Sequence, residues 1–381
     1  MANNNENKVL NVPHLRFPEF SGEWVTKSIN DLAVVIGGGT PDTTVKSYWD
    51  GEIQWFTPSE IGKNKYVDSS LRTITEVGLN NSSAKLLPPN TILLSSRATI
   101  GECSLSLREC ATNQGFQCLV SKKCNVDFLY YLIQTKKKDL IRKSCGSTFL
   151  EISANEVRKI QVSVPSDVEQ QKIAELLSLI DERIATQNKI IEDLKKLKSA
   201  IRKKMFSLLK DEYTESFEIN QLLDYEQPTA YIVANDEYST DTSLTPVLTA
   251  NKGFILGYTD EKFGIYQKGE CIIFDDFTMD AKYVSFPFKV KSSAIKILTA
   301  KPNVNLRFMF EYLSYWEFKS EEHKRHYISE IASLVIELPS KERQSIIASL
   351  MTSLNSKLDI EAKTKIRYEE QKRYLLSQMF I

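Results

Sequence analysis

The residues that could do chemistry in this chain are few, and their spacing fits none of the common catalytic sites. The run Leu87-Pro-Pro-Asn90 lacks the polar first residue and the aromatic last residue of an adenine methyltransferase tetrapeptide, so we interpret it as a turn. Gly37-Gly-Gly-Thr40 is not followed by Lys and Ser or Thr, and it enters Pro41 rather than a helix, so it is no phosphate-binding loop. A permissive backbone alone explains its glycines.

Metal-dependent chemistry finds no better support. A nuclease of the paired-acid type would use an Asp-x-Lys triplet with a further upstream Asp. Such triplets begin at Asp260 and Asp280, and chance accounts for them in a chain rich in both residue types. The six cysteines contain no C-x-x-C pair, and we interpret His323 and His326 as a solvated helix face. We therefore expect no catalytic residue, no metal site and free thiols.

Length and composition indicate a globular protein of more than one domain. A chain of 381 residues is too long for one ordinary core. Its 49 Lys and Arg balance 49 Asp and Glu, so any site for a polyanion must be a local patch. The N-terminal residues include no leader-like apolar segment, and no apolar run approaches about 18 residues. We expect a soluble, cytoplasmic protein without a membrane contact.

A long helix over residues 165–210 must hold the other elements in place. From Ile173 onward, mostly apolar residues recur at alternating steps of four and three. A 3.5-residue repeat over five heptads needs a partner helix to bury its stripe, so it predicts a coiled coil. An amphipathic helix lying on a globular core is the alternative, although it would be shorter and follow the 3.6-residue period. The predicted seam is Ile173, Leu177, Ile180, Ile184, Ile191, Leu194, Ile201 and Met205.

The chain is an internal repeat. Shifting the sequence by 174 positions lays residues 339–381 on residues 165–207 without gaps, and Gln170/Gln344 and Phe206/Phe380 are among the identical pairs. The second helix has Glu361, Lys365 and Lys372 where apolar residues would pack better. Its simplest partner is the first helix. Its predicted seam is Ile347, Met351, Leu354 and Leu358.

Each long helix follows a globular segment of mixed character. After an N-terminal segment, 1–23, the first globule spans 24–164 and has strand-like runs at 92–94 and 116–120, then a helix near 128–141. The second globule spans 211–338, with strand-like runs at 271–274 and 294–298 and a helix near 306–315. The order globule, helix, globule, helix predicts an α+β (mixed α/β) fold.

Short runs distributed along the chain carry a likeness to a known family. They are the entry Pro13 to Trp24, the run Val164-Pro-Ser-Asp-Val-Glu-Gln-Gln-Lys-Ile-Ala174 with its copy Leu338 to Ala348, Thr112-Asn-Gln-Gly115, Tyr225-Glu-Gln-Pro228, Thr245 to Ala250, and Phe274-Asp-Asp-Phe277. With these runs, the layout resembles the specificity subunit of a Type I restriction-modification enzyme over essentially the whole chain. The second spacer helix has Asn355 where the first has Asp181, which leaves the strength of its packing open.

The resemblance implies two target-recognition domains held apart by an antiparallel coiled coil of the two helices, with pseudo-two-fold symmetry. Each domain would read one half of a split target in double-stranded DNA. The chain itself would be non-catalytic and would scaffold two methyltransferase subunits and the restriction-translocase subunits. S-adenosylmethionine, ATP and Mg²⁺ would belong to those partners, with no cofactor in this chain. Two other classes stay open: a coiled-coil scaffold that reads no DNA, and a stand-alone nuclease or methyltransferase.

Local basic clusters supply candidate phosphate contacts, which position a protein on DNA without reading its sequence. The better cluster lies just ahead of Cys145-Gly-Ser-Thr148, and the cluster between Lys195 and Lys210 is equally typical of a solvated helix end. The candidates in the better cluster are Lys136, Lys137, Arg142 and Lys143.

Base reading needs hydrogen-bonding side chains on loops. Asp275 and Asp276 would repel phosphate, so they either accept from a cytosine amino group or organise their loop. The first globule offers Thr57, Ser59, Arg97, Asn113, Gln114, Ser147 and Thr148, and the second offers Tyr231, Thr249, Asn251, Lys252, Thr278, Lys282 and Lys291.

Overall fold

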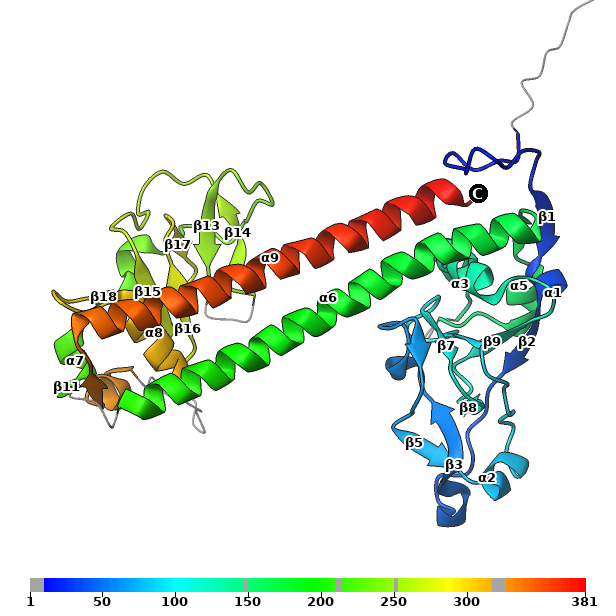
Figure 1. The fold of residues 1–381 in the computed structure, drawn as a ribbon, viewed down its shortest axis with the longest axis horizontal. Coiled ribbons are helices and arrows are strands. Elements are labelled where there is room, and N and C mark those ends of the chain that lie inside the picture. The colour runs from blue at the N-terminus through cyan, green and yellow to red at the C-terminus, as the bar shows by residue number, and fades with distance from the viewer. Residues whose placement is uncertain (1–9, 147–149, 210–213, 250–252, 317–326) are drawn as a thin grey trace, which may run out of the picture. The chain divides into compact units, whose positions relative to one another are not determined.

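A computed structural model describes residues 10–146, 150–209, 214–249, 253–316 and 327–381 (Figure 1). The chain divides into two compact units. Unit 1 contains Met1–Lys189 together with Lys363–Ile381, and unit 2 contains Ile190–Ala362. Each unit has its own sheets and its own hydrophobic core.

Unit 1 is built on three sheets of short strands. The runs expected at 92–94 and 116–120 are confirmed as the neighbouring strands β6 and β9. The five-stranded sheet has the order β2 (Ala33–Gly37), β9 (Gln117–Ser121), β6 (Ile92–Leu94), β7 (Cys103–Ser106) and β4 (Tyr66–Val67). The three-stranded sheet has the order β5 (Arg72–Ile74), β3 (Trp49–Phe56) and β8 (Cys110–Thr112). In the third sheet, β1 (Val25–Ser28) pairs with β10 (Gln161–Val164).

The helix expected near 128–141 is two helices, so that prediction was wrong in its continuity. Helix α3 (Val126–Thr135) ends where the Thr135 hydroxyl donates to the Leu132 carbonyl, 2.7 Å away. The Lys136 backbone N–H bonds Ile133 O in a tighter turn, and α4 (Lys137–Arg142) follows. The other short helices of unit 1 are α1 (Ile29–Leu32), α2 (Glu76–Asn80) and α5 (Ala154–Lys159).

Unit 2 repeats this plan with different strands. The runs expected at 271–274 and 294–298 and the helix expected at 306–315 are confirmed as β15, β18 and α8 (Leu306–Tyr315). The four-stranded sheet has the order β12 (Leu223–Glu226), β18 (Ile295–Ala300), β15 (Cys271–Asp275) and β16 (Ala281–Val284). The three-stranded sheet has the order β14 (Ile255–Thr259), β13 (Thr245–Leu248) and β17 (Lys289–Val290). The third sheet pairs β11 (Glu215–Glu218) with β19 (Val335–Leu338), and α7 (Ile219–Leu222) follows β11.

Two long helices follow the globular segments where the heptad spacing predicted helices. Helix α6 spans Asp167–Leu208, 42 residues, and α9 spans Lys341–Met379, 39 residues. Both begin after a Pro-Ser pair. The Ser166 hydroxyl accepts from the Glu169 N–H at 3.4 Å, and the Ser340 hydroxyl accepts from the Arg343 N–H at 3.3 Å. The serines therefore cap both helices in the same way.

The core of unit 1 joins the beginning of α6 to the end of α9. Ile173, Leu177 and Ile180 share this core with Leu375, Met379 and Phe380. The Phe380 ring stacks on Phe128 of α3 with centroids 5.3 Å apart, and it meets Trp24 edge-on at 6.4 Å. Ile184 packs against the same core from a partly buried position.

The core of unit 2 joins the end of α6 to the beginning of α9. Phe206 shares this core with Ile347 and Met351, and its ring meets Tyr312 of α8 at 5.0 Å. Among the other predicted seam residues, Ile201, Met205 and Leu354 pack partly buried against this core, and Ile191, Leu194 and Leu358 are half-buried.

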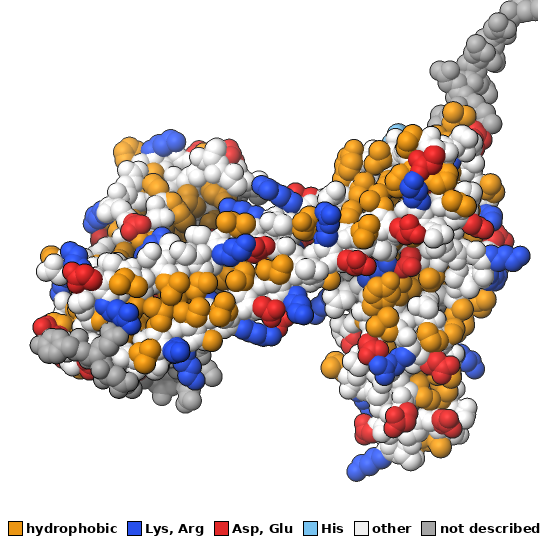
Figure 2. Space-filling view, viewed as in Figure 1, with side chains coloured by type: hydrophobic (Ala, Val, Ile, Leu, Met, Phe, Trp, Pro, Cys, Tyr) orange, Lys and Arg blue, Asp and Glu red, His pale blue; other side chains and the backbone are white. Residues whose placement is uncertain are grey.

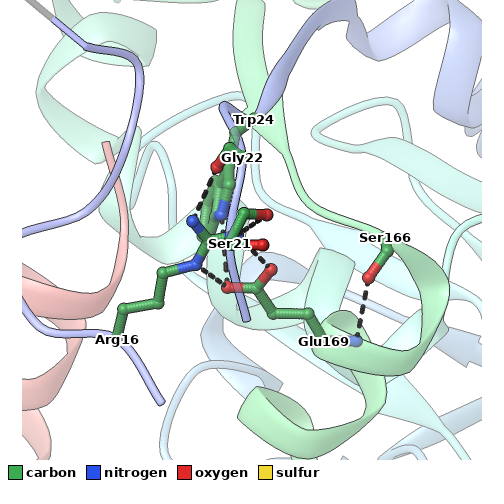
Figure 3. A network of polar contacts seen from close by, with 6 residues as sticks. All are labelled: Arg16, Ser21, Gly22, Trp24, Ser166 and Glu169. Carbon is green, nitrogen blue, oxygen red and sulfur yellow. Dashed lines mark hydrogen bonds and ion pairs between the residues drawn. The ribbon is translucent and has the colours of Figure 1, made fainter. Parts of the chain in front are cut away.

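A buried carboxylate ties the N-terminal segment of unit 1 to α6 (Figure 3). Both oxygens of Glu169 accept from the Arg16 guanidinium at 2.7 Å, and the Trp24 indole N–H donates to one of them at 3.3 Å. Arg16 also donates to the carbonyls of Ser21 and Gly22. This bidentate pair satisfies a charge that is 1% exposed. It explains why the entry run and the first turn of α6 carry these residue types.

Within the described ranges, we find no helical stretch long and apolar enough to span a lipid bilayer.

Neighbouring residues of α6 give a stability test of the unit 1 core. Ile180 is 5% exposed and Leu179 is 57% exposed. Ile180→Asp should lower the free energy of unfolding by about 3 kcal/mol or more, because it removes apolar packing and buries a charge without a partner. Leu179→Asp is the matched control and should change it by less than about 0.5 kcal/mol. Denaturant titration of both variants makes the comparison, and equal losses would contradict this placement of the core.

Candidate nucleic-acid interface

Four loops of unit 1 come together and bring several predicted base readers into one place. Two of them, 37–41 and 112–115, are held by the Gly39 N–H, which donates to Thr112 O at 2.8 Å, and by the Thr40 hydroxyl, which donates to the Gln114 side-chain carbonyl. A Cβ on Gly38 would clash with the backbone of Asn113. The glycine run thus permits a close approach between loops, which agrees with the backbone explanation for its glycines.

The third loop follows β3 and contains Thr57 and Ser59. The Thr57 N–H and hydroxyl both donate to the Glu60 carboxylate, at 2.7 and 2.6 Å, and its hydroxyl lies 3.1 Å from that of Ser59. Asn113 N donates to Phe56 O at 3.1 Å, which seats this loop beside 112–115. Thr57 is therefore occupied in capping a short turn, whereas Ser59 is exposed.

The fourth loop, 95–97, follows β6. Ser96 N donates to Gly115 O at 2.8 Å, and the Arg97 guanidinium pairs with Glu151 at 2.8 Å. The Ser96 hydroxyl is buried and has no hydrogen-bond partner among the described atoms. We call residues 37–41, 57–60, 95–97 and 112–115 the unit 1 loop cluster. The predicted readers Ser147 and Thr148 lie outside the described residues.

The predicted readers of unit 2 are distributed between core and surface. Tyr231 is buried and its hydroxyl donates to Glu226 at 2.7 Å, and Thr249 is also buried. Thr278, Lys282 and Lys291 are exposed. Asn251 and Lys252 lie outside the described residues. Exposed polar side chains in this unit are therefore available at 278, 282 and 291.

Asp275 and Asp276 organise their loop, which is one of the two roles that their charge left open. Asp275 accepts from the N–H groups of Phe277 and Thr278 at 2.9 and 3.3 Å. Asp276 accepts from the Tyr327 N–H at 2.8 Å and lies 3.4 Å from the Lys296 ammonium. Both carboxylates are buried, so their negative charge is compensated inside unit 2.

Three of the predicted phosphate contacts already have partners within unit 1. Lys136 donates to Ile381 O at 2.6 Å, and burial lowers the pKa of its ammonium. Lys137 pairs with Glu102, and Arg142 pairs with Asp139 at 2.8 Å. Lys143 is half-buried. Basic and acidic side chains also intermingle on the visible face of the molecule (Figure 2). A phosphate at this cluster would compete with carboxylates for the same cations.

Sequence reasoning missed Arg72 on β5. Its guanidinium carbon lies 3.5 Å from the ring centroid of Trp49. In the β3–β5 pairing, Arg72 lies opposite Trp55 and Trp49 lies opposite Ile74, with an irregularity of β3 between the two tryptophans. Cation–π attraction to the indole restrains the guanidinium, and a restrained donor fork suits contacts to bases or phosphates. Its exposure adds it to the candidates. Its spacing in the sequence gives no hint of this stacking.

The described residues hold no group of three or more His, Cys, Asp or Glu side chains arranged to bind a metal ion. The six cysteines are free thiols. Burial raises the pKa of Cys103, Cys110, Cys118 and Cys271 to about 12, so they stay protonated at neutral pH and are poor nucleophiles.

Comparison with protein families gives two matches in one chain. The model described as a Type I restriction modification DNA specificity domain matches residues 21–196 and again residues 212–370. The MjaIX type I restriction enzyme specificity subunit of Methanocaldococcus jannaschii is 38% identical over 216 residues, which are 55% of this chain and 50% of that protein. A type I restriction enzyme specificity subunit of Escherichia coli is 39% identical over 178 residues, 42% of this chain and 43% of the relative. The chain spans about half the length of these curated relatives.

Solved structures share the fold along nearly the whole chain. The S subunit of a Type I restriction-modification system from M. genitalium superimposes with a TM-score of 0.65 at 17% identity, covering 97% of this chain and 99% of that one. A chain from a structural study of complex assembly in the type I R-M system gives a TM-score of 0.58 at 12% identity, with 95% and 98% coverage. At these identities, the likeness concerns the fold alone.

Thiol labelling tests the burial of the cysteines. Iodoacetamide at pH 8 should modify exposed Cys145 in the native chain and spare Cys103, Cys110, Cys118 and Cys271, since a pKa raised to about 12 keeps them as thiols until far higher pH. Peptide mass spectrometry identifies the labelled sites, and unfolding in guanidinium should make all six reactive. Rapid labelling of native Cys118 or Cys271 would show that those strands open.

Proposed function

The chain belongs to the Type I restriction-modification DNA specificity family, and we propose that it is the sequence-reading subunit of such an enzyme. The observation that carries this proposal is the repeated family match, at 21–196 and 212–370, since each copy takes in one globule and most of the long helix after it. Each globule reads one half of a split target in double-stranded DNA. In the first globule, the unit 1 loop cluster and Arg72 supply side chains for base and backbone contacts.

We further propose that α6 and α9 form an antiparallel coiled coil related by pseudo-two-fold symmetry, with domain boundaries at 24–164, 165–210, 211–338 and 339–381. Packing within each unit supports this: α6 begins beside the end of α9 in unit 1, and α6 ends beside the beginning of α9 in unit 2. Apolar residues at steps of four and three are the pattern that such a pair buries.

The chain acts as a non-catalytic subunit in this proposal, working in the cytoplasm. Two methyltransferase subunits and the restriction-translocase subunits assemble on it, and they bring S-adenosylmethionine, ATP and Mg²⁺. Its buried thiols and its loop-borne polar residues suit recognition better than reaction chemistry. The following experiments would also detect the two alternatives, a scaffold that reads no DNA and an enzyme that works without partner subunits.

Domain exchange tests the division of labour. Replacing residues 24–163 by the matching domain of another specificity subunit should change one half of the methylated target and leave the other half intact. Genome-wide mapping of methyladenine in cells that carry the partner subunits reads out both halves at once. A swap that altered both halves, or neither, would refute the modular reading. Methylation by the purified chain alone would refute its non-catalytic role.

A point substitution tests the unit 1 loop cluster. Gln114 is exposed at the tip of the loop 112–115. Gln114→Ala should weaken binding of the assembled methyltransferase to its target by about tenfold, because a good side-chain pair to a base contributes roughly 1–3 kcal/mol of discrimination. Gln171→Ala, which truncates an exposed glutamine on α6, is the matched control and should bind like the wild type. Equal affinities of both variants at constant salt would remove Gln114 from the site.

A further inference from the structure

Two polar clusters occupy corresponding positions in the two copies of the repeat. In each unit a lysine on the later half of one long helix approaches a polar residue on the earlier half of the other. These pairs are Lys372 with Asp181 and Lys198 with Asn355, and the corresponding members lie 174 positions apart. Each cluster has a third member on a helix of the globule. In unit 1 it is Tyr131 of α3, six residues after the capping Asn125, and in unit 2 it is Glu311 of α8, six residues after the capping Asn305.

The unit 1 cluster has its carboxylate on the long helix. Asp181 of α6 lies 2.7 Å from the Lys372 ammonium, and it accepts a 2.7 Å hydrogen bond from the Tyr131 hydroxyl. Burial, together with the charge of Asp181, raises the pKa of Tyr131, so the phenol keeps the proton that it donates. An acid, an ammonium and a neutral donor thus meet here, and a second ammonium, that of Lys65, lies 4.9 Å from the centre of the Tyr131 ring.

The unit 2 cluster has its carboxylate on the globule instead. Glu311 of α8 is buried and accepts from the Arg202 guanidinium at 3.0 and 2.6 Å and from the Asn355 amide at 3.2 Å. Lys198 donates to the Asn355 side-chain carbonyl and lies 4.0 Å from Glu311. Burial lowers the pKa of Lys198, and the charges of Glu311 and Asp359 oppose that shift.

We infer that the carboxylate lies on the long helix in one copy and on the globule in the other, and that this difference restricts each globule to its own end of the helix pair. A globule carrying Glu311 placed against Asp181 would bring two carboxylates to one lysine. A globule carrying Tyr131 placed against Asn355 would remove the carboxylate that Arg202 and Lys198 share. Either mismatch buries charge that lacks its partner, which costs far more than the loss of a neutral hydrogen bond.

This restriction goes beyond the proposed function, because it concerns which surfaces of the chain fit together and not what the globules bind. It also explains why the second long helix can have Asn355 where the first has Asp181. The second spacer copy has not lost an ion pair, since the carboxylate has moved to Glu311 and the lysine at the corresponding helix position is kept.

A double-substitution cycle on the full-length chain tests the inference. Asn355→Asp adds a second acid beside Glu311, and Glu311→Gln removes the acid that Arg202 and Lys198 share, so each should lower the midpoint of thermal unfolding by about 5 °C or more. The double variant E311Q/N355D carries one acid on the long helix, as unit 1 does. It should lose less than either single variant.

Asp181→Asn is the matched control in the other unit. It places on α6 the residue that α9 carries at the corresponding position, yet it should destabilise the chain because Lys372 and Tyr131 then lack their acid. Hydrogen exchange of residues 126–135 and 306–315 assigns each loss to one unit. Losses that add in E311Q/N355D, or an Asn355→Asp variant as stable as the wild type, would overturn the inference.

Discussion

A buried glutamine determines where each globule joins its long helix. Gln170 donates to Pro165 O at 3.0 Å and accepts from the Asn125 N–H at 3.0 Å. Its counterpart Gln344 makes the same two bonds, to Pro339 O and from the Asn305 N–H, at 2.9 and 2.8 Å. One amide thus satisfies the carbonyl ahead of the long helix and the N–H at the cap of the globule's helix. Each group left unpaired there would cost about 1–3 kcal/mol. The same two asparagines cap the N–H groups of Phe128 and Phe308, whose rings lie in the cores of unit 1 and unit 2.

The unit 1 loop cluster is held mainly by backbone groups. Three of its four loops are joined through N–H and carbonyl groups, as in the bonds from Gly39 to Thr112 and from Ser96 to Gly115. Such bonds constrain the path of the chain but not the side chains beyond it. An exposed side chain that joins no two loops, such as Ser59, can therefore differ without moving them, which is the property that a surface for reading many different sequences requires.

Local periodicity made the long helices and α8 predictable, because each depends on apolar spacing and capping residues that lie close together in the sequence. The break at Lys136 was not predictable, since it depends on the Thr135 hydroxyl turning back to the chain. The Arg72–Trp49 stack and the burial of Tyr231 depend on pairings between distant strands and loops. Two polar seam residues of the second helix find partners that helical spacing does reveal, since Glu361 pairs with Lys357 and Lys365 lies 3.5 Å from Glu369, each four residues away. The partner of Lys372 was not predictable, because Asp181 lies on the other long helix.

The packing of Phe380 against Trp24 and Phe128 also has a consequence for synthesis. Ribosomes make the chain from its N-terminus, and the strand pair β1–β10 can form as soon as residue 164 has emerged. The core of unit 1 nevertheless waits for Leu375, Met379 and Phe380, which arrive after all of unit 2 has been made. Until then, α9 does not cover the apolar face of α6 around Ile173 and Leu177. The first globule to be translated is therefore completed last. During that interval it exposes apolar surface of the kind that makes folding intermediates prone to aggregation and explains why chaperones exist.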